Sequence, residues 1–401
     1  NQETILAANA EDVSRAEEGV AAGELSPPLL KRLKLAGKKF DTTLTMVRSV
    51  RDQQDPLGRT LAATELAPEL ELYRVSVPIG VIGVIFESRP DALVQIAALA
   101  LKSGNAVLMK GGSEAAKTNA ALAATIADAT RTLPAMPQGW LGLMETREDV
   151  RAILDLNEHI DLLIPRGSNA FVQHIMANTN IPVMGHADGV CHVYVDADAD
   201  LEQAVRITVD AKTQYVAVCN AAETLLVHRE VADQFLPRVA DALQAEGVQL
   251  RGDDHVRRIL PQAQPATDDD WTTEYLDRIL AVRVVDDIEA AVAHINNYGS
   301  HHTDAIVTAN RATATRFLQA VDSSSVLHNA STRFADGFRY GLGAEVGIST
   351  HRLHSRGPVG LEGLTSYKYI LEGHGQTVDD FEGDTPRDYT HRPLDTTWEG
   401  S

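Results

Sequence analysis

The chain has 401 residues, 44% of them hydrophobic and 23% charged, which is the ordinary composition of a globular protein with two or three domains. Its 56 acidic residues outnumber its 36 lysines and arginines and give a net charge of −20, which argues against a protein that binds nucleic acid or an anionic membrane. The longest apolar run, Val75–Phe86, is too short to cross a bilayer. Two cysteines make no disulfide framework and favour a reducing cytoplasm.

The first part of the chain alternates strand-like apolar runs with amphipathic helical stretches. The continuous apolar run Ile79–Phe86 predicts a strand that is covered on both faces, and Pro90 and Gly104 predict the start and the end of the helix that follows. We expect further strands at 105–110 and 161–164 and further helices at 115–129 and 169–178. Strand, helix and strand again predict βαβ units and a parallel, doubly wound sheet.

A second α/β block follows with the same alternation. We expect strands at 192–195, 224–227, 282–285 and 304–307, and helices at 201–212, 231–245 and 288–297. The polar segment Pro261–Glu274 predicts a surface excursion. The segment from Gly373 to Ser401 is rich in Gly, Asp, Thr and Pro, and its weak periodicity predicts an extended or loosely ordered arm.

Cys219 lies in a turn-like CNAAE stretch immediately before the strand-like TLLV. A thiol at such a junction can be exposed above the edge of a sheet, where nearby backbone N–H groups favour the thiolate, the nucleophilic form of cysteine. Local sequence alone favours a buried core cysteine, because free cysteine is among the most buried residue types. The same argument favours a core position for Cys191.

Two turns that lead from a strand into a helix are candidates for binding an anion. Free N–H groups at the start of a helix attract anions, and Lys110 adds a positive charge to the KGGSEAAKTN turn. Neither that turn nor PRGSN at Pro165–Asn169 matches a P-loop or a GxGxxG motif, so each alone is a weak signal. Their place on successive units of one sheet favours a nucleotide crevice at the carboxyl ends of its strands.

Two other motifs have ordinary explanations. GLGAEVG (Gly341–Gly347) has the wrong spacing for a phosphate loop, and a glycine-rich surface or interdomain loop is expected there. His301 and His302, with Asp304, could be metal ligands, but no HExxH or paired CxxC motif accompanies them. A structural or hydrogen-bonding role is therefore favoured for both histidines.

Several long stretches resemble, in order along the chain, the γ-glutamyl phosphate reductase family of the aldehyde dehydrogenase superfamily. They are VPIGVIGVIFESRPDA, KSGNAVLMKGGSEA, LLIPRGSNA, GVCHVYVDADADLEQA, AKTQYVAVCNAAETLLVH, AAVAHINNYGSHHTDAI and NASTRFADGFRYGLGAEVGISTHRLHSRGPVGLEGLTSYKY. The resemblance runs to about Glu372 and is most specific around Cys219 and from Asn329 to Tyr369. It overrides the local preference for a buried Cys219.

The resemblance implies an α/β fold of the aldehyde dehydrogenase kind, with two doubly wound α/β domains and a small oligomerisation flap, in a homo-oligomer. The implied parts are a cofactor-binding domain (1–70 and 79–188), a catalytic domain with the nucleophilic cysteine (189–363), the flap (71–78 and 364–372) and an extended tail (373–401).

The resemblance also implies a reaction in the cytoplasm, that of a phosphorylating glutamate-5-semialdehyde dehydrogenase. Such an enzyme reduces L-glutamyl 5-phosphate with NADPH to L-glutamate 5-semialdehyde and phosphate, the second step of proline biosynthesis from glutamate. Cys219 would attack the acyl phosphate and form a thioester that then accepts a hydride. The backbone N–H of Cys219 is the first candidate for binding the oxyanion, and the side chain of Asn220 is the second.

The other implied site residues bind ligands. The resemblance implies no metal ion and places NADPH/NADP+ on Lys110, Ser113, Glu114, Arg166, Gly167, Ser168 and Glu345. It places the anionic substrate on Arg89, His186, Asn329, Ser331, Thr332 and Arg333. For Arg333 and Glu345, bonding between domains explains the residue equally well.

One departure bears on the chemistry. Hydrolytic members of the superfamily carry a glutamate, in an ELGG stretch, that activates water. The corresponding stretch here is HADG, which puts His186 at or near that position. Phosphate rather than water would then discharge the thioester in the reverse direction, and His186 either binds substrate or is structural.

Two other functions stay open. A hydrolytic aldehyde dehydrogenase is one, and the missing glutamate argues against it. A non-catalytic oligomeric scaffold of the same fold is the other, and the retained Cys219 argues against it. We expect no fused kinase, so a separate glutamate kinase that makes the labile acyl phosphate is a candidate partner.

The charge balance makes one prediction about salt. Lysine is scarce, with 9 lysines against 27 arginines, and an excess of acidic residues with few lysines is typical of salt-adapted proteins. We expect the protein to keep its fold and its activity in molar KCl, which screens the repulsion among surface carboxylates. Circular dichroism and activity assays across a KCl series measure this, and loss of either in molar KCl would contradict salt adaptation.

Overall fold

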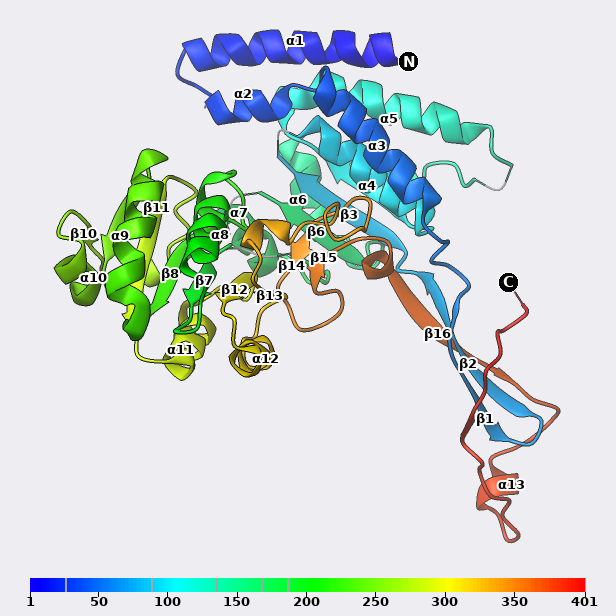
Figure 1. The fold of residues 1–401 in the computed structure, drawn as a ribbon. Helices are drawn as coiled ribbons and strands as arrows, with labels where there is room; N and C mark the ends of the chain where they lie inside the picture. Colours follow the sequence, from blue (N-terminus) through cyan, green and yellow to red (C-terminus); the bar gives the residue numbers. More distant parts are fainter. Residues whose placement is uncertain (26, 88, 135, 168, 186–187, 401) are drawn as a thin grey trace.

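The structure, a computed structural model, describes residues 1–25, 27–87, 89–134, 136–167, 169–185 and 188–400. Two α/β units lie side by side, and a long narrow arm of strands projects away from them (Figure 1). Before the first strand come α1 (Gln2–Ala21), α2 (Pro27–Leu33) and α3 (Lys38–Asp52). Helix α1 lies along α5 (Ala116–Arg131), where the carboxylate of Asp12 accepts hydrogen bonds from the backbone N–H and the hydroxyl of Thr118, both at 2.7 Å.

The first unit is built on a four-stranded parallel sheet in the order β5-β4-β3-β6. Its strands are β3 (Val81–Phe86), β4 (Ala106–Lys110), β5 (Leu141–Leu143) and β6 (Leu162–Arg166). Its helices are α4 (Pro90–Lys102), the single turn η1 (Ser113–Ala115), α5, α6 (Arg147–Leu154) and α7 (Asn169–Ala177). Because β3 lies inside the sheet and later strands are added on both sides of it, the sheet is doubly wound, as predicted.

The ends of these elements follow local chemistry. Pro90 occupies the first turn of α4, and Gly104 follows that helix with a φ of +70°, a left-handed conformation that glycine adopts without strain. Thr146 and Asp149 form a capping box at the start of α6. Helices α4 and α5 cover one face of the sheet and α6 and α7 the other, so the apolar run of β3 is buried on both faces.

The second unit is a seven-stranded parallel sheet in the order β10-β9-β11-β8-β7-β12-β13. Its strands are β7 (Cys191–Val195), β8 (Ala222–His228), β9 (Gln249–Gly252), β10 (Gln264–Pro265), β11 (Ile279–Val285), β12 (Thr303–Val307) and β13 (Ser325–His328). Its helices are α8 (Leu201–Thr213), α9 (Arg229–Ala245), α10 (Asp254–Ile259), η2 (Asp268–Thr272), α11 (Ile288–Tyr298), α12 (Arg311–Ala320) and η3 (Thr332–Phe334). Every helix and strand predicted from the sequence overlaps one of the elements of these two units.

The prediction of a surface excursion at Pro261–Glu274 is wrong for part of that segment. Strand β10 extends the sheet, and η2 carries Trp271 into the interior, where the side chain of Arg283 lies over its ring at 5.5 Å. Asp270 is also buried and accepts hydrogen bonds from Arg251 and Tyr275. One tryptophan anchors the segment, and a single apolar residue leaves no periodic pattern in the sequence.

The arm is an antiparallel sheet in the order β16-β2-β1-β17. Its strands are β1 (Thr60–Ala67), β2 (Leu70–Pro78), β16 (Thr365–Glu372) and β17 (Arg392–Pro393). Strands β2 and β16 correspond to the two predicted parts of the flap. The sheet also takes in β1, which the sequence analysis gave to the cofactor-binding domain, and β17, which belongs to the tail. The short strands β14 (Ile348–Ser349) and β15 (Gly357–Pro358) and the turn η4 (Glu362–Leu364) precede β16.

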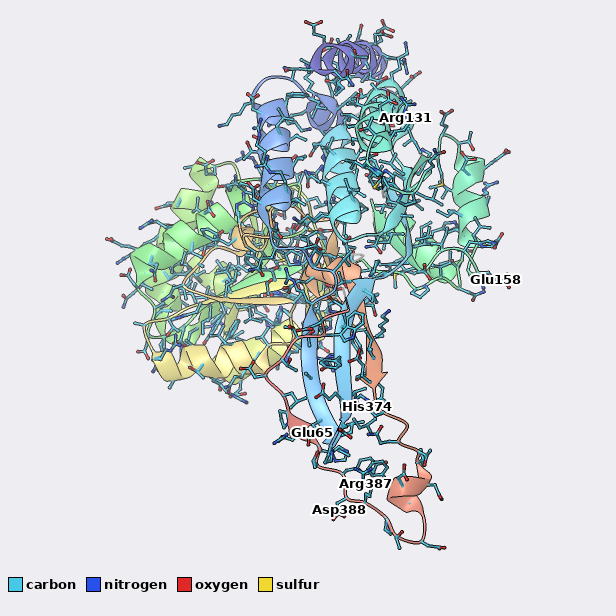
Figure 2. All side chains as sticks on the ribbon, turned by 90° about the vertical axis from the view of Figure 1, so that its right-hand side faces the viewer. Glu65, Arg131, Glu158, His374, Arg387 and Asp388 are labelled. Atoms are coloured by element: carbon cyan, nitrogen blue, oxygen red, sulfur yellow. The ribbon has the colours of Figure 1, made fainter. Side chains whose placement is uncertain are left out.

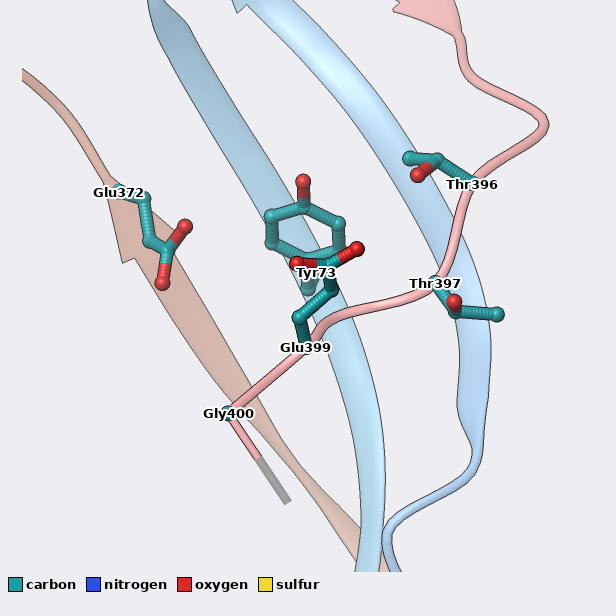
Figure 3. A pocket seen from close by; sticks show the side chains of 6 residues that line it. All are labelled: Tyr73, Glu372, Thr396, Thr397, Glu399 and Gly400. Carbon is teal, nitrogen blue, oxygen red and sulfur yellow. The ribbon is translucent and has the colours of Figure 1, made fainter.

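The tail folds back along the arm instead of extending away from it (Figure 2). Its short helix α13 (Asp379–Glu382) places Phe381 against Leu70 of the arm, and Phe381 stacks on Tyr389 at 4.5 Å. Farther on, Trp398 packs over Tyr73 of β2 and donates its indole N–H to Glu372 at 2.9 Å. Figure 3 shows the last residues of the tail crossing β2 beside Tyr73 and Glu372. The tail therefore covers the β1 edge of the sheet, which would otherwise present unpaired backbone groups.

The tail contact makes a stability prediction. Trp398→Ala removes the apolar contact with the arm and the hydrogen bond to Glu372, and should lower the free energy of unfolding by about 2 kcal/mol. Trp398→Phe keeps most of the apolar contact and should cost about 1 kcal/mol. Urea unfolding of both variants measures the difference. Wild-type stability in Trp398→Ala would show that the tail adds nothing to the arm.

Candidate active site

Cys219 lies in the loop 214–221 between α8 and β8, at the edge of the second sheet where its parallel strands begin. Cys191 begins the neighbouring strand β7, and His302 immediately precedes β12, which lies on the other side of β7. The topology therefore brings two thiols and an imidazole together from distant parts of the chain. Cys219 is partly exposed, whereas Cys191 is fully buried, as the sequence predicted.

The imidazole of His302 contacts the thiol of Cys219, with 3.2 Å between Nε2 and Sγ. The side chain of His302 is fully buried, and its Nδ1 lies 2.8 Å from the hydroxyl of Thr303. The carbonyl of His302 accepts hydrogen bonds from the hydroxyl of Ser324 and the backbone N–H of Ser325. A hydrogen-bonding role is the one that the sequence favoured for His302, but nothing in the sequence pointed to Cys219 as its partner.

The backbone of the Cys219 loop packs so closely against Gly189 that a side chain there has no room. A Cβ on Gly189 would lie 2.1 Å from the carbonyl oxygen of Cys219 and 2.5 Å from its Cα. The thiol of Cys191 donates to the same carbonyl oxygen at 3.1 Å, and the side-chain amide of Asn220 donates to the carbonyl of Ala335 at 2.8 Å. These contacts fix the backbone on both sides of the reactive sulfur.

A buried ion pair joins the two ends of the loop. Lys212, at the end of α8, lies 2.6 Å from the carboxylate of Glu223 in β8, and neither side chain is exposed. Burial raises the pKa of Glu223 to about 7 and lowers the pKa of Lys212, and the charge of each partner opposes the shift of the other. The second carboxylate oxygen of Glu223 accepts from the backbone N–H of Leu276 at 3.3 Å.

Two arginines that the sequence assigned to ligands lie within electrostatic reach of Cys219. Burial is the largest effect on the pKa of Arg166 and lowers it, whereas the carboxylate of Glu345 and the thiolate of Cys219 act in the opposite direction. Burial likewise lowers the pKa of Arg333, and the thiolate of Cys219 raises it. Because guanidinium groups stay protonated in proteins, the sulfur faces fixed positive charge from both α/β units.

Arg166 and Glu345 also connect the two units. The guanidinium of Arg166, at the end of β6, lies 3.9 Å from one carboxylate oxygen of Glu345, and the other oxygen accepts from the backbone N–H of Gly337 at 2.8 Å. Burial raises the pKa of Glu345, and Arg166 acts against that shift. The GLGAEVG loop is thus an interdomain loop, one of the two positions expected for it.

Three of the predicted cofactor residues lie in the turn after β4. Lys110 is buried, and its ammonium donates to the carbonyl of Gly111. Ser113 is exposed and donates to the carboxylate of Glu114 at 3.3 Å. A Cβ on Gly112 would lie 2.4 Å from that carboxylate, so glycine leaves the space that Glu114 occupies.

Gly167 follows β6 at the same edge of the first sheet, where a Cβ would lie 3.0 Å from Phe171 and 3.1 Å from the carboxylate of Glu87. The predicted cofactor residue Ser168 and the predicted substrate residue His186 lie outside the described residues. The cofactor residues that are described therefore share the carboxyl edge of the first sheet, and Glu345 meets that edge from a loop whose Ala344 and Val346 are buried in the core of the first unit.

The predicted substrate residues after β13 have local contacts. The side-chain amide of Asn329 accepts a hydrogen bond from the backbone N–H of Thr308 and donates one to the carbonyl of Thr308, both at 3.0 Å. Ser331 caps η3. Thr332 is fully buried, and its hydroxyl has no hydrogen-bond partner within the part of the chain that the structure describes. The contacts of Asn329 and Ser331 hold the loop, and direct binding of substrate by these residues stays a prediction.

The two predicted substrate arginines differ in exposure. Arg333 is buried and donates from Nε to Gln214 at 3.0 Å, which ties η3 to the start of the Cys219 loop. The side chain of Arg89 is 46% exposed and lies 3.5 Å from the buried carboxylate of Asp91, so its guanidinium can also meet a ligand.

The described residues form neither a metal-binding cluster nor a membrane-spanning helix. Over the described residues, no three His, Cys, Asp or Glu side chains are grouped so that they could hold a metal ion. No helix in that same part of the chain is long and apolar enough to cross a membrane.

Comparisons with known proteins agree on one family. The aldehyde dehydrogenase family model matches residues 29–257. The chain is 56% identical to the γ-glutamyl phosphate reductase of Natronomonas pharaonis, over 98% of this chain and 90% of that one, and 54% identical to that of Haloquadratum walsbyi, over 99% and 88%. The solved structure of γ-glutamyl phosphate reductase from Thermotoga maritima has a TM-score of 0.89 at 40% identity, covering 94% of this chain and 90% of that one. An acetylating aldehyde dehydrogenase from Geobacillus thermoglucosidasius, 17% identical with a TM-score of 0.62, shares the fold. These likenesses confirm the predicted aldehyde dehydrogenase-like α/β fold.

Gly189 offers a test of the loop geometry. Gly189→Ala should displace the backbone of Cys219 and lower catalytic turnover about 100-fold, the cost of a displacement of about 1 Å at a reacting atom. Gly185→Ala is the matched control, because a Cβ there would lie 3.5 Å from its nearest neighbour, an ordinary contact. Equal turnover in the two variants would contradict the close packing at Gly189.

The Lys212–Glu223 pair makes a second prediction. Lys212→Met leaves a buried carboxylate without its partner and should cost about 3–5 kcal/mol of stability, whereas Lys212→Met with Glu223→Leu should recover most of that loss. Lys34→Met breaks the half-exposed pair with Glu17 and should cost less than about 1 kcal/mol. Urea unfolding compares the three proteins. A double variant no more stable than Lys212→Met alone would contradict the predicted coupling.

Proposed function

We propose that this chain, which belongs to the γ-glutamyl phosphate reductase family of the aldehyde dehydrogenases, reduces L-glutamyl 5-phosphate to L-glutamate 5-semialdehyde and phosphate. This reaction is the second step of proline biosynthesis from glutamate. The observation that carries the proposal is the identity of 56% over nearly the whole chain, joined to a partly exposed Cys219 that faces cationic side chains of both α/β units.

The residues around Cys219 suit an acyl phosphate. The carbonyl carbon of such a substrate is electrophilic, and its phosphate is anionic, so Arg89, Arg166 and Arg333 can neutralise the leaving group while the thiolate attacks. The bond from sulfur to the acyl carbon forms, and the bond from that carbon to the phosphate oxygen breaks. The product is a thioester on Cys219.

The oxyanion of this step needs a hydrogen-bond donor. The backbone N–H of Cys219 is the first candidate, because the loop that presents it is fixed by Gly189 and Cys191. The side-chain amide of Asn220 ranks second, because one of its hydrogens is already donated to Ala335. One such donor is typically worth about 3 kcal/mol of transition-state stabilisation.

The carboxyl edge of the first sheet fits a phosphorylated dinucleotide, and we take NADPH/NADP+ as the cofactor. Glycines 111 and 112 let the side chains of Asn119 and Glu114 lie against the turn after β4, while Lys110 and the exposed hydroxyl of Ser113 suit a 2′-phosphate. Glu114 suits a ribose hydroxyl, and the remaining candidates are Arg166, Gly167, Ser168 and Glu345. When bound, NADPH supplies the hydride that reduces the thioester.

Phosphate, not water, is the proposed acceptor in the reverse direction. The HADG stretch lacks the glutamate that activates water in hydrolytic relatives. A general base that activated water at this position would hydrolyse the thioester before phosphate could react with it. His186 either binds substrate or has a structural role in this proposal.

The arm supplies a surface for the proposed homo-oligomer. Strand β16 forms an open edge of the arm, and Tyr367, Tyr369 and Leu371, which alternate along one face of it, are 49%, 61% and 56% exposed. Because acyl phosphates are labile, a glutamate kinase in the same cytoplasm is the proposed source of substrate.

The test runs the reaction backwards. Purified protein is given NADP+ and pyrroline-5-carboxylate, which is in equilibrium with the semialdehyde, with and without inorganic phosphate. We expect continued turnover, beyond one NADPH per active site, only with phosphate, and we expect Cys219→Ser to abolish NADPH formation.

The other outcomes separate the alternative functions. Turnover without phosphate would identify a hydrolytic aldehyde dehydrogenase and contradict the proposal. Binding of NADPH with no turnover under either condition would identify a non-catalytic scaffold.

A further inference from the structure

His302 is not among the residues assigned a catalytic or ligand-binding role above, yet it contacts the reacting sulfur. Its Nε2 lies 3.2 Å from Sγ of Cys219, and its side chain is fully buried between the starts of β7 and β13. A protonatable ring buried against a partly exposed thiol is the arrangement that general acid–base catalysis requires.

The local structure holds this ring in one orientation. His301, the preceding residue, has a φ of +60°, in the left-handed region that non-glycine residues seldom adopt. Its Nδ1 bonds the carbonyl of Asp322 at 2.6 Å, and its side chain is 41% exposed. Two successive histidines thus have opposite environments, one at the surface and one against Cys219.

The neighbours of His302 are compatible with the tautomer that accepts a proton from sulfur. With its hydrogen on Nδ1, the ring donates to the hydroxyl of Thr303 at 2.8 Å, and Nε2 is free of hydrogen and can accept from the thiol.

We propose that His302 is a catalytic residue, the group that takes the thiol proton of Cys219 when the sulfur attacks and protonates the sulfur when it leaves. The inference deepens the proposed function, since it assigns the proton transfers of that reaction.

The proton can be followed through the cycle. It moves from Sγ of Cys219 to Nε2 of His302 as the sulfur–carbon bond forms. As the carbon–oxygen bond to phosphate breaks, the imidazolium gives this proton to the leaving group, which departs as hydrogen phosphate, and the imidazole is neutral again. Reduction of the thioester takes one proton from solvent. When the thiohemiacetal collapses, its hydroxyl proton passes through His302 to the departing sulfur.

Other ionisable groups interact with this pair, namely Cys191 from β7, Arg166 from the end of β6 and Arg333 from η3. Glu223 from β8 and Asp304 from β12 act on Cys191 and so reach the pair indirectly. The two arginines stay charged at every pH used below, so their contribution is the same in wild type and in a His302 variant. Glu223, whose pKa burial raises to about 7, titrates in the same range as an ordinary imidazole. Its effect on Cys219 would persist in a His302 variant, so such a variant separates the two.

The experiment measures the rate at which iodoacetamide alkylates Cys219 from pH 6 to pH 9, read by mass spectrometry of the Cys219 peptide. Only a thiolate reacts, and an unassisted cysteine loses about tenfold in rate per pH unit below about pH 8. Wild-type protein should stay within about tenfold of its pH 9 rate at pH 6, because His302 holds the proton. His302→Gln should follow the unassisted slope and react at least about 30-fold more slowly than wild type at pH 6.

The control is the neighbouring histidine. His301→Asn replaces the imidazole of the preceding residue with a side chain that tolerates a positive φ, and it should leave the alkylation profile unchanged. Thermal unfolding checks that each variant is folded. Identical alkylation profiles in wild type and in a folded His302→Gln would overturn the proposal. If His302→Gln does not fold, the wild-type profile is the test, and an unassisted slope in wild-type protein would overturn the proposal.

Turnover of pyrroline-5-carboxylate with phosphate is measured on the same proteins. His302→Gln should lose about 100-fold or more, the usual contribution of a general acid–base group. Phosphate-dependent turnover together with an unassisted alkylation slope would reject the role of His302 and leave the proposed function standing. A flat alkylation profile with no phosphate-dependent turnover would reject the proposed function alone.

Discussion

The reactive geometry depends on how closely the loop 214–221 packs against the amino edge of the second sheet. Gly189 has no Cβ where the carbonyl of Cys219 passes, and this lets the thiol of Cys191 reach the same carbonyl. A larger residue at that point would push the loop outward, away from His302. The Lys212–Glu223 pair closes the base of the loop, where an ion pair taken fully out of water is stable only with good geometry. Backbone contacts thus place the partly exposed sulfur.

The charges around that sulfur come from both units. A protein with a net charge of −20 repels an anionic substrate over most of its surface, so binding needs a local concentration of positive charge. Arg166 and Arg333 supply it near Cys219 from different sheets, and Arg89 stands at the start of α4 with nearly half of its side chain exposed. Glu345 contacts Arg166 and also accepts a hydrogen bond from Gly337 close to η3, so one carboxylate contacts both the charged edge of the first sheet and the loop that leaves the second unit.

The sequence predicts the fold well where a pattern is long. Alternating apolar runs and amphipathic helices give both sheets, and each predicted element overlaps an observed one. It fails where one residue decides. Trp271 anchors a polar segment, and Trp398 fixes the tail on the arm, but a single aromatic residue in a polar stretch leaves no periodicity.

The site was predictable in part for a related reason. Cys219 and the turn of Lys110 stand out because short motifs surround them. The partnership of His302 with Cys219 joins residues 83 positions apart and arises from the order of strands β8, β7 and β12, which local sequence does not encode. The buried pair of Lys212 and Glu223 is hidden for the same reason, because either residue alone looks like a solvated charge.

The central claim is that catalysis passes through a thioester on Cys219 that phosphate discharges. Intact-protein mass spectrometry tests it directly, on enzyme mixed with NADP+ and pyrroline-5-carboxylate in the absence of phosphate. The account predicts a glutamyl adduct, mapped to the Cys219 peptide, that disappears when phosphate is added. An unmodified Cys219 under conditions where NADPH still forms would contradict it.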